Sequence, residues 1–282
     1  MGKRVKILRE TMKAAEDGCY FVEEREVKLP FSFEQIKEVA LYTPEQVAQL
    51  PARDMSGSEP SRITLRNQDT LEAAFELHQR RKENEKPVLV LNFANPHRPG
   101  GGIRSRPGTQ EEHLCIKTTV LCSLETEEAW PFYQTNLDCG TQAQTDTILI
   151  SPNTMVIRNP DLSLREDPFP IAVMTVSAPI ASRMEQEELP NLENILRGRI
   201  RGMLRVAAAE GYTRLVLGAW GCGNFGNDPE LVAKLFHQVL MVCNPITGPC
   251  YTEWFEEITM AVFDNTAERM RYHAFTQYFS EG

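Results

Sequence analysis

A buried strand followed by a glycine-rich loop and a helix start constrains this chain more than any other feature of its sequence. Residues 88–93 are almost wholly apolar and predict a central strand. The glycines 100–102 follow, and a helix is expected to begin near Thr109. Strand, glycine loop and helix N-terminus in this order form the usual geometry for holding a phosphate group. Glu111 and Glu112 stand at this helix start, although carboxylates repel the anion that such a loop attracts.

The composition restricts the class of protein and the kind of partner. The 282 residues suffice for one large domain or two small ones. A net charge of −9 disfavours broad electrostatic binding to DNA or RNA, because such binding needs a basic face. The seven cysteines form no CxxC pair, so a disulfide framework and a zinc site both fit poorly and a reduced compartment is indicated. The chain shows no apolar signal segment and no apolar run of about 18 residues, so we expect a cytoplasmic protein without a membrane partner.

Apolar periodicity and turn residues predict strands that alternate with helices along most of the chain. We expect helices over residues 1–17, 69–81, 109–125, 192–210, 229–242 and 267–279, with one or two short helices within 31–50. We expect strands over residues 19–30, 63–66, 88–93, 146–150, 155–157, 171–176, 215–217 and 258–263, with a turn at 151–153 and an exposed loop at 55–62. The arginines of the helix over 192–210 are expected on its solvent side. This alternation indicates an α/β fold with a mixed, mostly parallel central sheet flanked by helices.

A second glycine-rich loop, residues 218–229, has the same setting as the first. It follows the apolar strand expected at 215–217 and precedes a helix. Both loops would therefore emerge at the carboxyl edge of the sheet, where ligands of open α/β sheets bind. Two such loops suit the two phosphates of a diphosphate, although glycine clusters also form plain turns. Neither loop matches the phosphate-loop pattern or the dinucleotide pattern, which disfavours triphosphate chemistry and hydride transfer.

The spacing of the glycines and glutamates resembles a known signature. PGGG, seven intervening residues and QEE are similar to the signature of the poly(ADP-ribose) glycohydrolases, whose catalytic part is a macrodomain. The loop GAWGCGNFGNDP resembles the microbial form of that family, and NFAN resembles the first loop of a macrodomain. The resemblance implies a macrodomain-like catalytic domain over residues 63–282, with residues 1–62 as a mainly helical extension packed on it. Two departures, Asn224 where the family often has Val and the stretch 96–98, bear on substrate preference.

The resemblance also implies roles for individual residues. Glu112, the second glutamate of QEE, would protonate the leaving ribose oxygen and then deprotonate the attacking water. Glu111 would hydrogen-bond the ribose hydroxyls, and Gln110 would support the turn. The other substrate-binding candidates are Asn95, Gly100, Gly101, Gly102, Gly221, Cys222, Gly223, Asn224, Phe225 and Gly226. The resemblance implies no metal and no separate cofactor.

The residues themselves leave simpler interpretations open. Thr109 and Glu112 have the spacing of a capping box, in which the glutamate only satisfies the helix start. Glu111 and Glu112 are adjacent on a helix and are expected to point in different directions, which excludes a glycosidase pair flanking one bond. Phe225 is equally consistent with a core residue, Cys222 with a small loop filler, and Asn95 with a turn residue.

The expected function is hydrolysis of the ribose–ribose O-glycosidic linkages of poly(ADP-ribose), which releases ADP-ribose. The expected partners are therefore poly(ADP-ribose) and ADP-ribosylated proteins, in the reversal of ADP-ribosylation during the DNA damage response, with the chain acting as a monomer. One alternative is a non-catalytic ADP-ribose-binding macrodomain module. Another is a hydrolase of single ADP-ribose groups.

Overall fold

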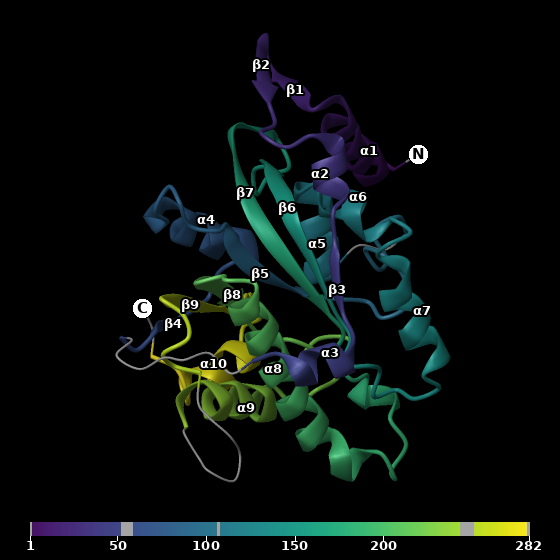
Figure 1. Ribbon diagram of the computed structural model, residues 1–282, viewed down its shortest axis with the longest axis vertical. Helices are drawn as coiled ribbons and strands as arrows, with labels where there is room; N and C mark the ends of the chain where they lie inside the picture. The colour runs from purple at the N-terminus through teal and green to yellow at the C-terminus, as the bar shows by residue number, and fades with distance from the viewer. Residues whose placement is uncertain (1, 52–58, 106–107, 243–250, 281–282) are drawn as a thin grey trace.

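A seven-stranded sheet runs through the centre of the protein (Figure 1). The computed structural model describes residues 2–51, 59–105, 108–242 and 251–280, so residues 55–58 of the loop expected at 55–62 lie outside the described residues. In spatial order the strands are β3 (Ala40–Tyr42), β6 (Ile148–Arg158), β7 (Leu164–Val176), β5 (Val88–Phe93), β8 (Arg214–Leu217), β9 (Glu257–Ala261) and β4 (Arg62–Arg66). The strands from β7 to β4 are parallel, whereas β3 and β6 pair antiparallel at one edge. The expected mixed, mostly parallel sheet is confirmed.

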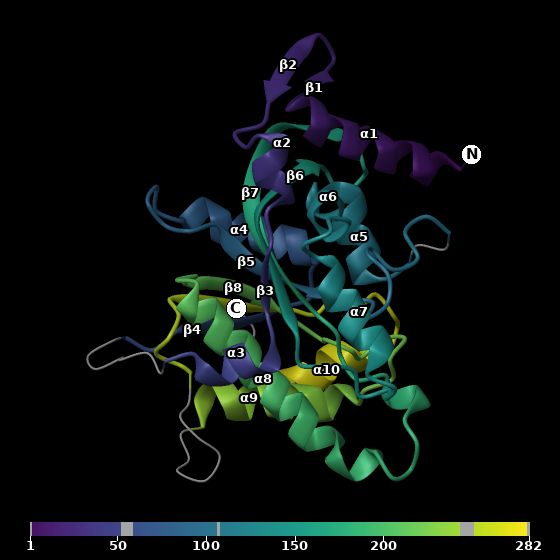
Figure 2. The same cartoon turned by 45° about the vertical axis from the view of Figure 1, so that its right-hand side comes forward.

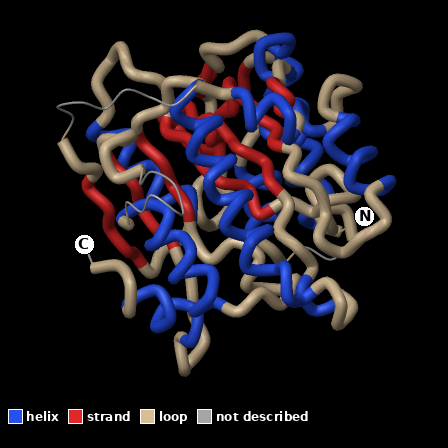
Figure 3. The backbone as a smooth tube through the Cα atoms, turned by 60° about the horizontal axis from the view of Figure 1, so that its bottom comes forward, coloured by secondary structure: helices blue, strands red, loops and turns tan. Residues whose placement is uncertain are grey.

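Helices cover both faces of this sheet (Figure 3). One face packs against α3 (Pro44–Gln49), α8 (Leu192–Ala209), α9 (Pro229–Met241) and α10 (Met270–Thr276). The other face packs against α4 (Thr70–Arg80), α5 (Gln110–Lys117), α6 (Val120–Leu124), α7 (Trp130–Asp138) and α1 (Lys3–Asp17). Two short 3₁₀ helices, η1 (Ala181–Arg183) and η2 (Leu189–Asn191), precede α8. Because β5 is covered on both faces, Val88 to Leu91 are all buried, as a continuous apolar run predicts.

Capping residues begin two of the helices that follow the parallel strands, α4 and α9. The Asp69 side chain accepts a hydrogen bond from Leu71 N–H, and Glu72 accepts one from Asp69 N–H at the start of α4. The Asp228 side chain accepts one from Glu230 N–H at the start of α9. Both starts are confirmed, because Asp at the N-cap is a local signal that needs no tertiary contact.

Residues 3–37 of the N-terminal extension lie at one end of the sheet, remote from α8 and α9 (Figure 2), whereas α3 packs against α8. α1 ends at Gly18, where φ is +69°, and leads into the hairpin of β1 (Cys19–Val22) and β2 (Arg25–Lys28). After α2 (Phe33–Lys37) the chain adds β3 to the edge of the main sheet, a strand that the sequence did not predict. The extension therefore contributes to the central sheet, and the domain boundary at residue 62 stays a prediction.

The helix expected over 109–125 is two helices, α5 and α6. Thr118 between them is extended, with φ −132° and ψ 168°, and forms a bridge with Val156 of β6. Thr119 N–H donates to Met155 O at 3.0 Å, and Met155 N–H donates to Thr119 Oγ1 at 3.0 Å. Pairing with β6 therefore interrupts the helix, and the single-helix prediction is wrong.

The strands expected at 146–150 and 155–157 are one continuous strand, β6. Its register against β7 shifts between Ser151 and Thr154, so residues 151–153 form an irregularity within the strand rather than a turn. Pro152 removes one N–H donor and is accommodated at this irregularity. β7 begins at Leu164, earlier than expected, so β6 and β7 form a long antiparallel ribbon.

Arg199 of α8 is buried, although the arginines of this helix were expected on the solvent side. The residue is only 2% exposed, and its Nε donates a hydrogen bond to Asp146 Oδ1 at 2.7 Å. Its Nη1 donates to Ser177 O at 2.7 Å. Arg199 therefore ties α8 to the end of β7 through groups that no periodicity on α8 reveals.

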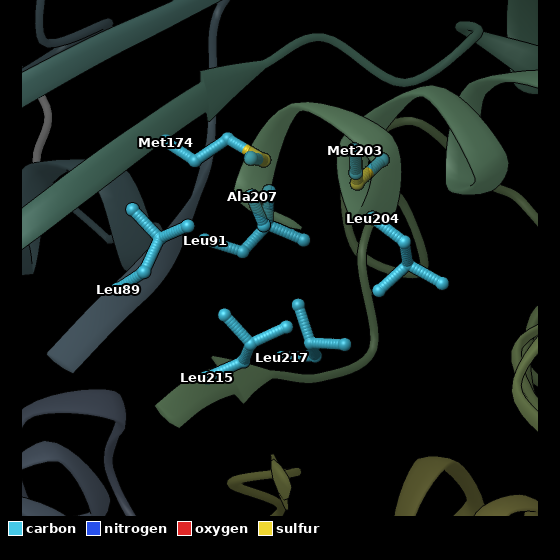
Figure 4. Close-up of a pocket in the computed structure, with 8 residues that line it drawn as sticks. All are labelled: Leu89, Leu91, Met174, Met203, Leu204, Ala207, Leu215 and Leu217. Carbon is cyan, nitrogen blue, oxygen red and sulfur yellow. The ribbon is translucent and has the colours of Figure 1, made fainter. Parts of the chain in front are cut away.

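A small void lies under α8 (Figure 4). It is lined only by apolar side chains: Leu89, Leu91, Met174, Met203, Leu204, Ala207, Leu215 and Leu217. Its volume is about 10 Å³, at the lower limit for one water molecule, which would also need polar partners. The void is a packing feature of the core. Among the described residues, no helix combines the length and apolar character needed to cross a membrane.

Candidate active site

A cavity of about 530 Å³ opens at the carboxyl ends of the parallel strands. This volume falls within the range of about 300–1,000 Å³ that small-molecule sites occupy. The residues that line it include Asn95, Gly101, Gln110, Glu111, Glu112, Gly221, Gly223, Asn224 and Phe225, all of them candidates from the sequence. Of the other candidates, Gly100, Gly102, Cys222 and Gly226 do not line the cavity. The two glycine loops therefore meet at one cavity, as their positions after parallel strands predict.

Gln110 fixes the start of α5 on β5. Its Oε1 accepts a hydrogen bond from Phe93 N–H at 3.0 Å. Its Nε2 donates to Leu91 O at 2.8 Å and to Thr70 Oγ1 at 3.2 Å. The Gln110 side chain therefore both donates and accepts a hydrogen bond at the end of β5, which fixes the position of the first turn of α5 relative to the sheet.

Glu111 is a buried carboxyl group. It is 1% exposed, and its Oε2 accepts a hydrogen bond from Asn95 N–H at 2.8 Å. Its Oε1 lies 3.3 Å from Asn92 Nδ2, which is itself fully buried on β5. Burial penalises the charged form and raises the pKa of Glu111 to about 8, against the opposing effect of these two donors. The protonated form of Glu111 is therefore favoured over a wider pH range than for an exposed glutamate.

Glu112 lies beside Glu111, but its pKa is shifted in the opposite direction. Three backbone N–H groups donate to its carboxylate: Gly102 at 2.8 Å, Thr109 at 2.6 Å, and Gly108. Burial alone would raise the pKa of Glu112, but these donors outweigh burial and lower it. The bond from Thr109 completes the capping box that the sequence allowed. Glu112 caps the helix and lines the cavity at the same time, so the two interpretations do not exclude each other.

The two carboxyl groups converge on Gly101. This residue has φ +55°, and a Cβ there would lie 2.9 Å from Glu111 Oε2 and 3.3 Å from Glu112 Oε1. Side-chain directions on an ideal helix predicted divergence, and that prediction is wrong because the glycine loop folds back across the first turn of α5. Only a residue without a Cβ leaves both carboxyl groups room at this point.

The first glycine loop uses two of its N–H groups internally. Gly101 N–H donates to Arg98 O at 3.0 Å, and Gly102 N–H donates to Glu112. Gly100, with φ +64°, is packed against the Leu121 and Cys115 side chains. Phosphate binding by Gly100 to Gly102 stays a prediction. It would require the N–H groups of Gly101 and Gly102 to leave their present acceptors and donate to the phosphate instead.

The second glycine loop has free N–H groups instead. Within the part of the chain that the structure describes, the N–H groups of Gly223, Asn224 and Phe225 donate no hydrogen bond. These three residues line the cavity. Consecutive free N–H groups in a tight loop form a concave site for an anion. The geometry therefore offers free N–H donors on one loop and a carboxyl pair on the other.

Comparisons with known proteins agree with this arrangement. A family model described as the catalytic domain of microbial-type PARG matches residues 8–159. The chain belongs to this family. The poly(ADP-ribose) glycohydrolase (PARG) of Thermomonospora curvata is 32% identical over 98% of this chain and 99% of that chain, with a TM-score of 0.85. Its complex with the inhibitor ADP-HPD gives a TM-score of 0.84 at the same identity and coverage.

A second relative is the PARG of Deinococcus radiodurans. Its complex with ADP-ribose is 32% identical over 89% of this chain and 98% of that chain, with a TM-score of 0.78. No curated protein matches the chain in a sequence search. The family match begins within α1, so the N-terminal extension is part of what this chain shares with microbial-type PARG.

The structure positions several candidates of this PARG-family site in ways that the sequence left open. Asn95 Oδ1 accepts hydrogen bonds from His97 N–H at 2.9 Å and Arg98 N–H at 3.0 Å, which is the turn role. Phe225 lines the cavity and also packs against the core. Cys222 packs against the core as a half-buried loop residue, and burial raises the pKa of its thiol. Contacts of Asn95 and Phe225 with a sugar or base stay predictions.

Phe263 and Arg271 are among the cavity residues that the sequence interpretation missed. Phe263, which follows β9, lines the cavity and is 57% exposed. Arg271 of α10 also lines it and pairs with Asp264 at 3.2 Å. Neither lies in a glycine loop, so only the fold brings them to the site. Across the described residues, no group of three or more His, Cys, Asp or Glu side chains is arranged to hold a metal ion.

Proposed function

We propose that this chain hydrolyses the ribose–ribose O-glycosidic linkages of poly(ADP-ribose), with Glu112 as the general acid/base. Membership of the microbial-type PARG family makes the chain a glycosidase, a poly(ADP-ribose) glycohydrolase. The observation that supports the role of Glu112 is the convergence of Glu111 and Glu112 on Gly101, inside the cavity that holds the second glycine loop.

The binding step uses the free N–H groups of residues 223–225. A diphosphate bound there sits opposite the carboxyl pair, so the sugar attached to it is presented to Glu112. Because its pKa is raised, Glu111 can carry a proton and donate a hydrogen bond to a ribose hydroxyl without bringing a second negative charge near the diphosphate. This division of charge accounts for acidic residues beside an anion site.

The chemical step requires a proton on Glu112. The protonated carboxyl gives its proton to the leaving ribose oxygen as the glycosidic bond breaks toward an oxocarbenium ion. The resulting carboxylate then takes a proton from water, whose oxygen forms the new bond to the anomeric carbon. In the free protein the pKa of Glu112 is lowered. A bound diphosphate acts in the opposite direction, because like charge disfavours the ionised form.

Two other functions are distinguished by one assay. The chain is incubated with labelled poly(ADP-ribose) and, separately, with a mono-ADP-ribosylated protein. We expect ADP-ribose to be released from the polymer and the last group on the protein to be retained. A non-catalytic binding module would retain both substrates, and a hydrolase of single groups would release label mainly from the modified protein. Either result would contradict the proposal.

The remaining expectations concern partners and location. Five of them stay predictions: binding of ADP-ribosylated proteins, action as a monomer, the absence of DNA or RNA binding, a cytoplasmic location and a role in the DNA damage response. Sedimentation of the purified chain tests one of these predictions, that the chain acts as a monomer.

A further inference from the structure

Asn227 closes the base of the second glycine loop. It is 2% exposed and directly precedes Asp228, the N-cap of α9. Its Nδ2 donates to Pro179 O at 2.8 Å and to Gly221 O at 3.1 Å, and its N–H also donates to Gly221 O at 3.1 Å. Both hydrogens of the amide are used, one on each of two chain segments. Because both acceptors are carbonyl oxygens, the orientation of the amide is fixed.

The two segments joined by Asn227 are in tight contact. Gly221 has φ +76°, and a Cβ there would lie 2.6 Å from the Ala178 Cβ and 2.6 Å from Asn227 Nδ2. Ala178 lines the cavity from the segment that follows β7, and Gly221 lines it from the glycine loop. The spacing between two walls of the cavity is therefore set at the point where the amide of Asn227 bonds both segments.

A second contact holds the far side of the same loop. Ser182 N–H, in η1, donates to Phe225 O at 2.9 Å, and Gly226 lies against the Ser182 side chain. The tip between these anchors, residues 222–226, is half-buried or exposed, whereas Asn227 is buried. The free N–H groups of residues 223–225 thus lie on a short span held at both ends.

We propose that Asn227 is a positioning residue for substrate binding: its side-chain amide holds the second glycine loop against the segment after β7 and so aims the N–H groups of 223–225 at the diphosphate. This inference rests on the proposed function. Asn227 does not line the cavity, so it acts through the loop. Glu112 is held by separate contacts on the other loop, so the effect of Asn227 falls on binding more than on the chemical step.

The variant Asn227→Asp tests the proposal with a side chain of the same shape. It removes both N–H donors and turns a carboxylate oxygen toward two carbonyl oxygens, which breaks the link. We expect the Kd for ADP-ribose and the KM for the polymer to rise about tenfold or more, since a lost hydrogen bond to a buried acceptor has an effect of this order. We expect kcat to change by less than about threefold, and hydrogen–deuterium exchange to accelerate in peptides covering 218–228.

Asn194→Asp is the matched control, because Asn194 is exposed on α8 and the charge change is the same. Its Kd and KM should stay within about twofold of the wild type. If Asn227→Asp does not fold, Asn227→Ala decides by the same criterion, since it removes the donors without adding charge. Binding of ADP-ribose within about twofold of the wild type by either folded variant would overturn the proposal. Failure of the wild-type chain to bind ADP-ribose would instead count against the proposed function.

Discussion

Glu111 and Glu112 are consecutive in the chain, yet both carboxyl groups end beside Gly101 and their pKa values are shifted in opposite directions. Glu112 accepts three backbone N–H bonds, and the pKa of its carboxyl is lowered. Glu111 accepts one backbone bond and one side-chain amide bond in a fully buried setting, and its pKa is raised to about 8. Neighbouring titratable groups whose pKa values are pushed apart are typical of acid/base sites.

The first prediction separates catalysis by Glu112 from helix capping. In Glu112→Ala, we expect ADP-ribose to bind with little change and turnover of the polymer to fall by about 10²–10⁴-fold, the usual contribution of a general acid/base. The matched control is Glu72→Ala. Glu72 has the same place in the capping box of α4, where it accepts a bond from Asp69 N–H, and it does not line the cavity.

Both substitutions remove a capping carboxylate, so each should lower the free energy of unfolding by about 1 kcal/mol. Only Glu112→Ala should lose turnover. Steady-state rates on labelled polymer, with urea denaturation of each variant, make the comparison. Equal turnover by the two variants would mean that Glu112 is a cap and no more.

The second prediction concerns the effect of substrate on Glu112. A bound diphosphate places negative charge near the carboxylate, so its pKa should be higher in the complex with ADP-ribose than in the free protein. By linkage, ADP-ribose should bind more tightly as the pH falls, with uptake of a proton on binding. NMR titration of ¹³C-labelled glutamate side chains measures this, with the Glu112→Ala spectrum as the assignment control. If the pKa of Glu112 is unchanged or lower with ADP-ribose bound, the prediction is wrong.

The third prediction follows from the raised pKa of Glu111. Between the unfolded value near 4.5 and the folded value near 8, the folded state holds a proton that the unfolded state has lost. Stability therefore falls as the pH rises through this window, by at most about 1.4 kcal/mol per pH unit. Glu111→Gln should remove this slope, and Asn92 can turn its otherwise unpartnered Oδ1 toward the new amide. Urea denaturation at pH 5, 7 and 9 tests it; parallel pH profiles for the two proteins would contradict it.

Features with local causes were predictable from the sequence. The apolar run of β5 needs burial on both faces, and the capped starts of α4 and α9 follow from Asp69 and Asp228. Placing both glycine loops at one edge of the sheet followed from their position after parallel strands. These predictions hold because each depends on a few neighbouring residues and on one rule of topology.

Features with distant causes were not predictable. The break after α5 arises from the bridge between Thr118 and Val156, and the burial of Arg199 arises from acceptors on two other segments. Neither partner lies near in sequence. The same applies to the glycine loops, because counting glycines does not tell which N–H groups are engaged. Only the fold shows that Gly102 donates to Glu112 and that Asn224 is free.

The fourth prediction tests the convergence at Gly101 itself. In Gly101→Ala, the new Cβ would lie 2.9 Å from Glu111 Oε2 and 3.3 Å from Glu112 Oε1, at a residue with φ +55°. One or both carboxyl groups must move, so we expect turnover to fall by at least about tenfold. Gly198→Ala is the control: its Cβ meets open space within α8, where alanine should stabilise the helix by about 0.5–1 kcal/mol and leave turnover unchanged. If Gly101→Ala folds and turns over polymer at the wild-type rate, the two carboxyl groups do not act from the positions seen here, because those positions leave no space for a methyl group.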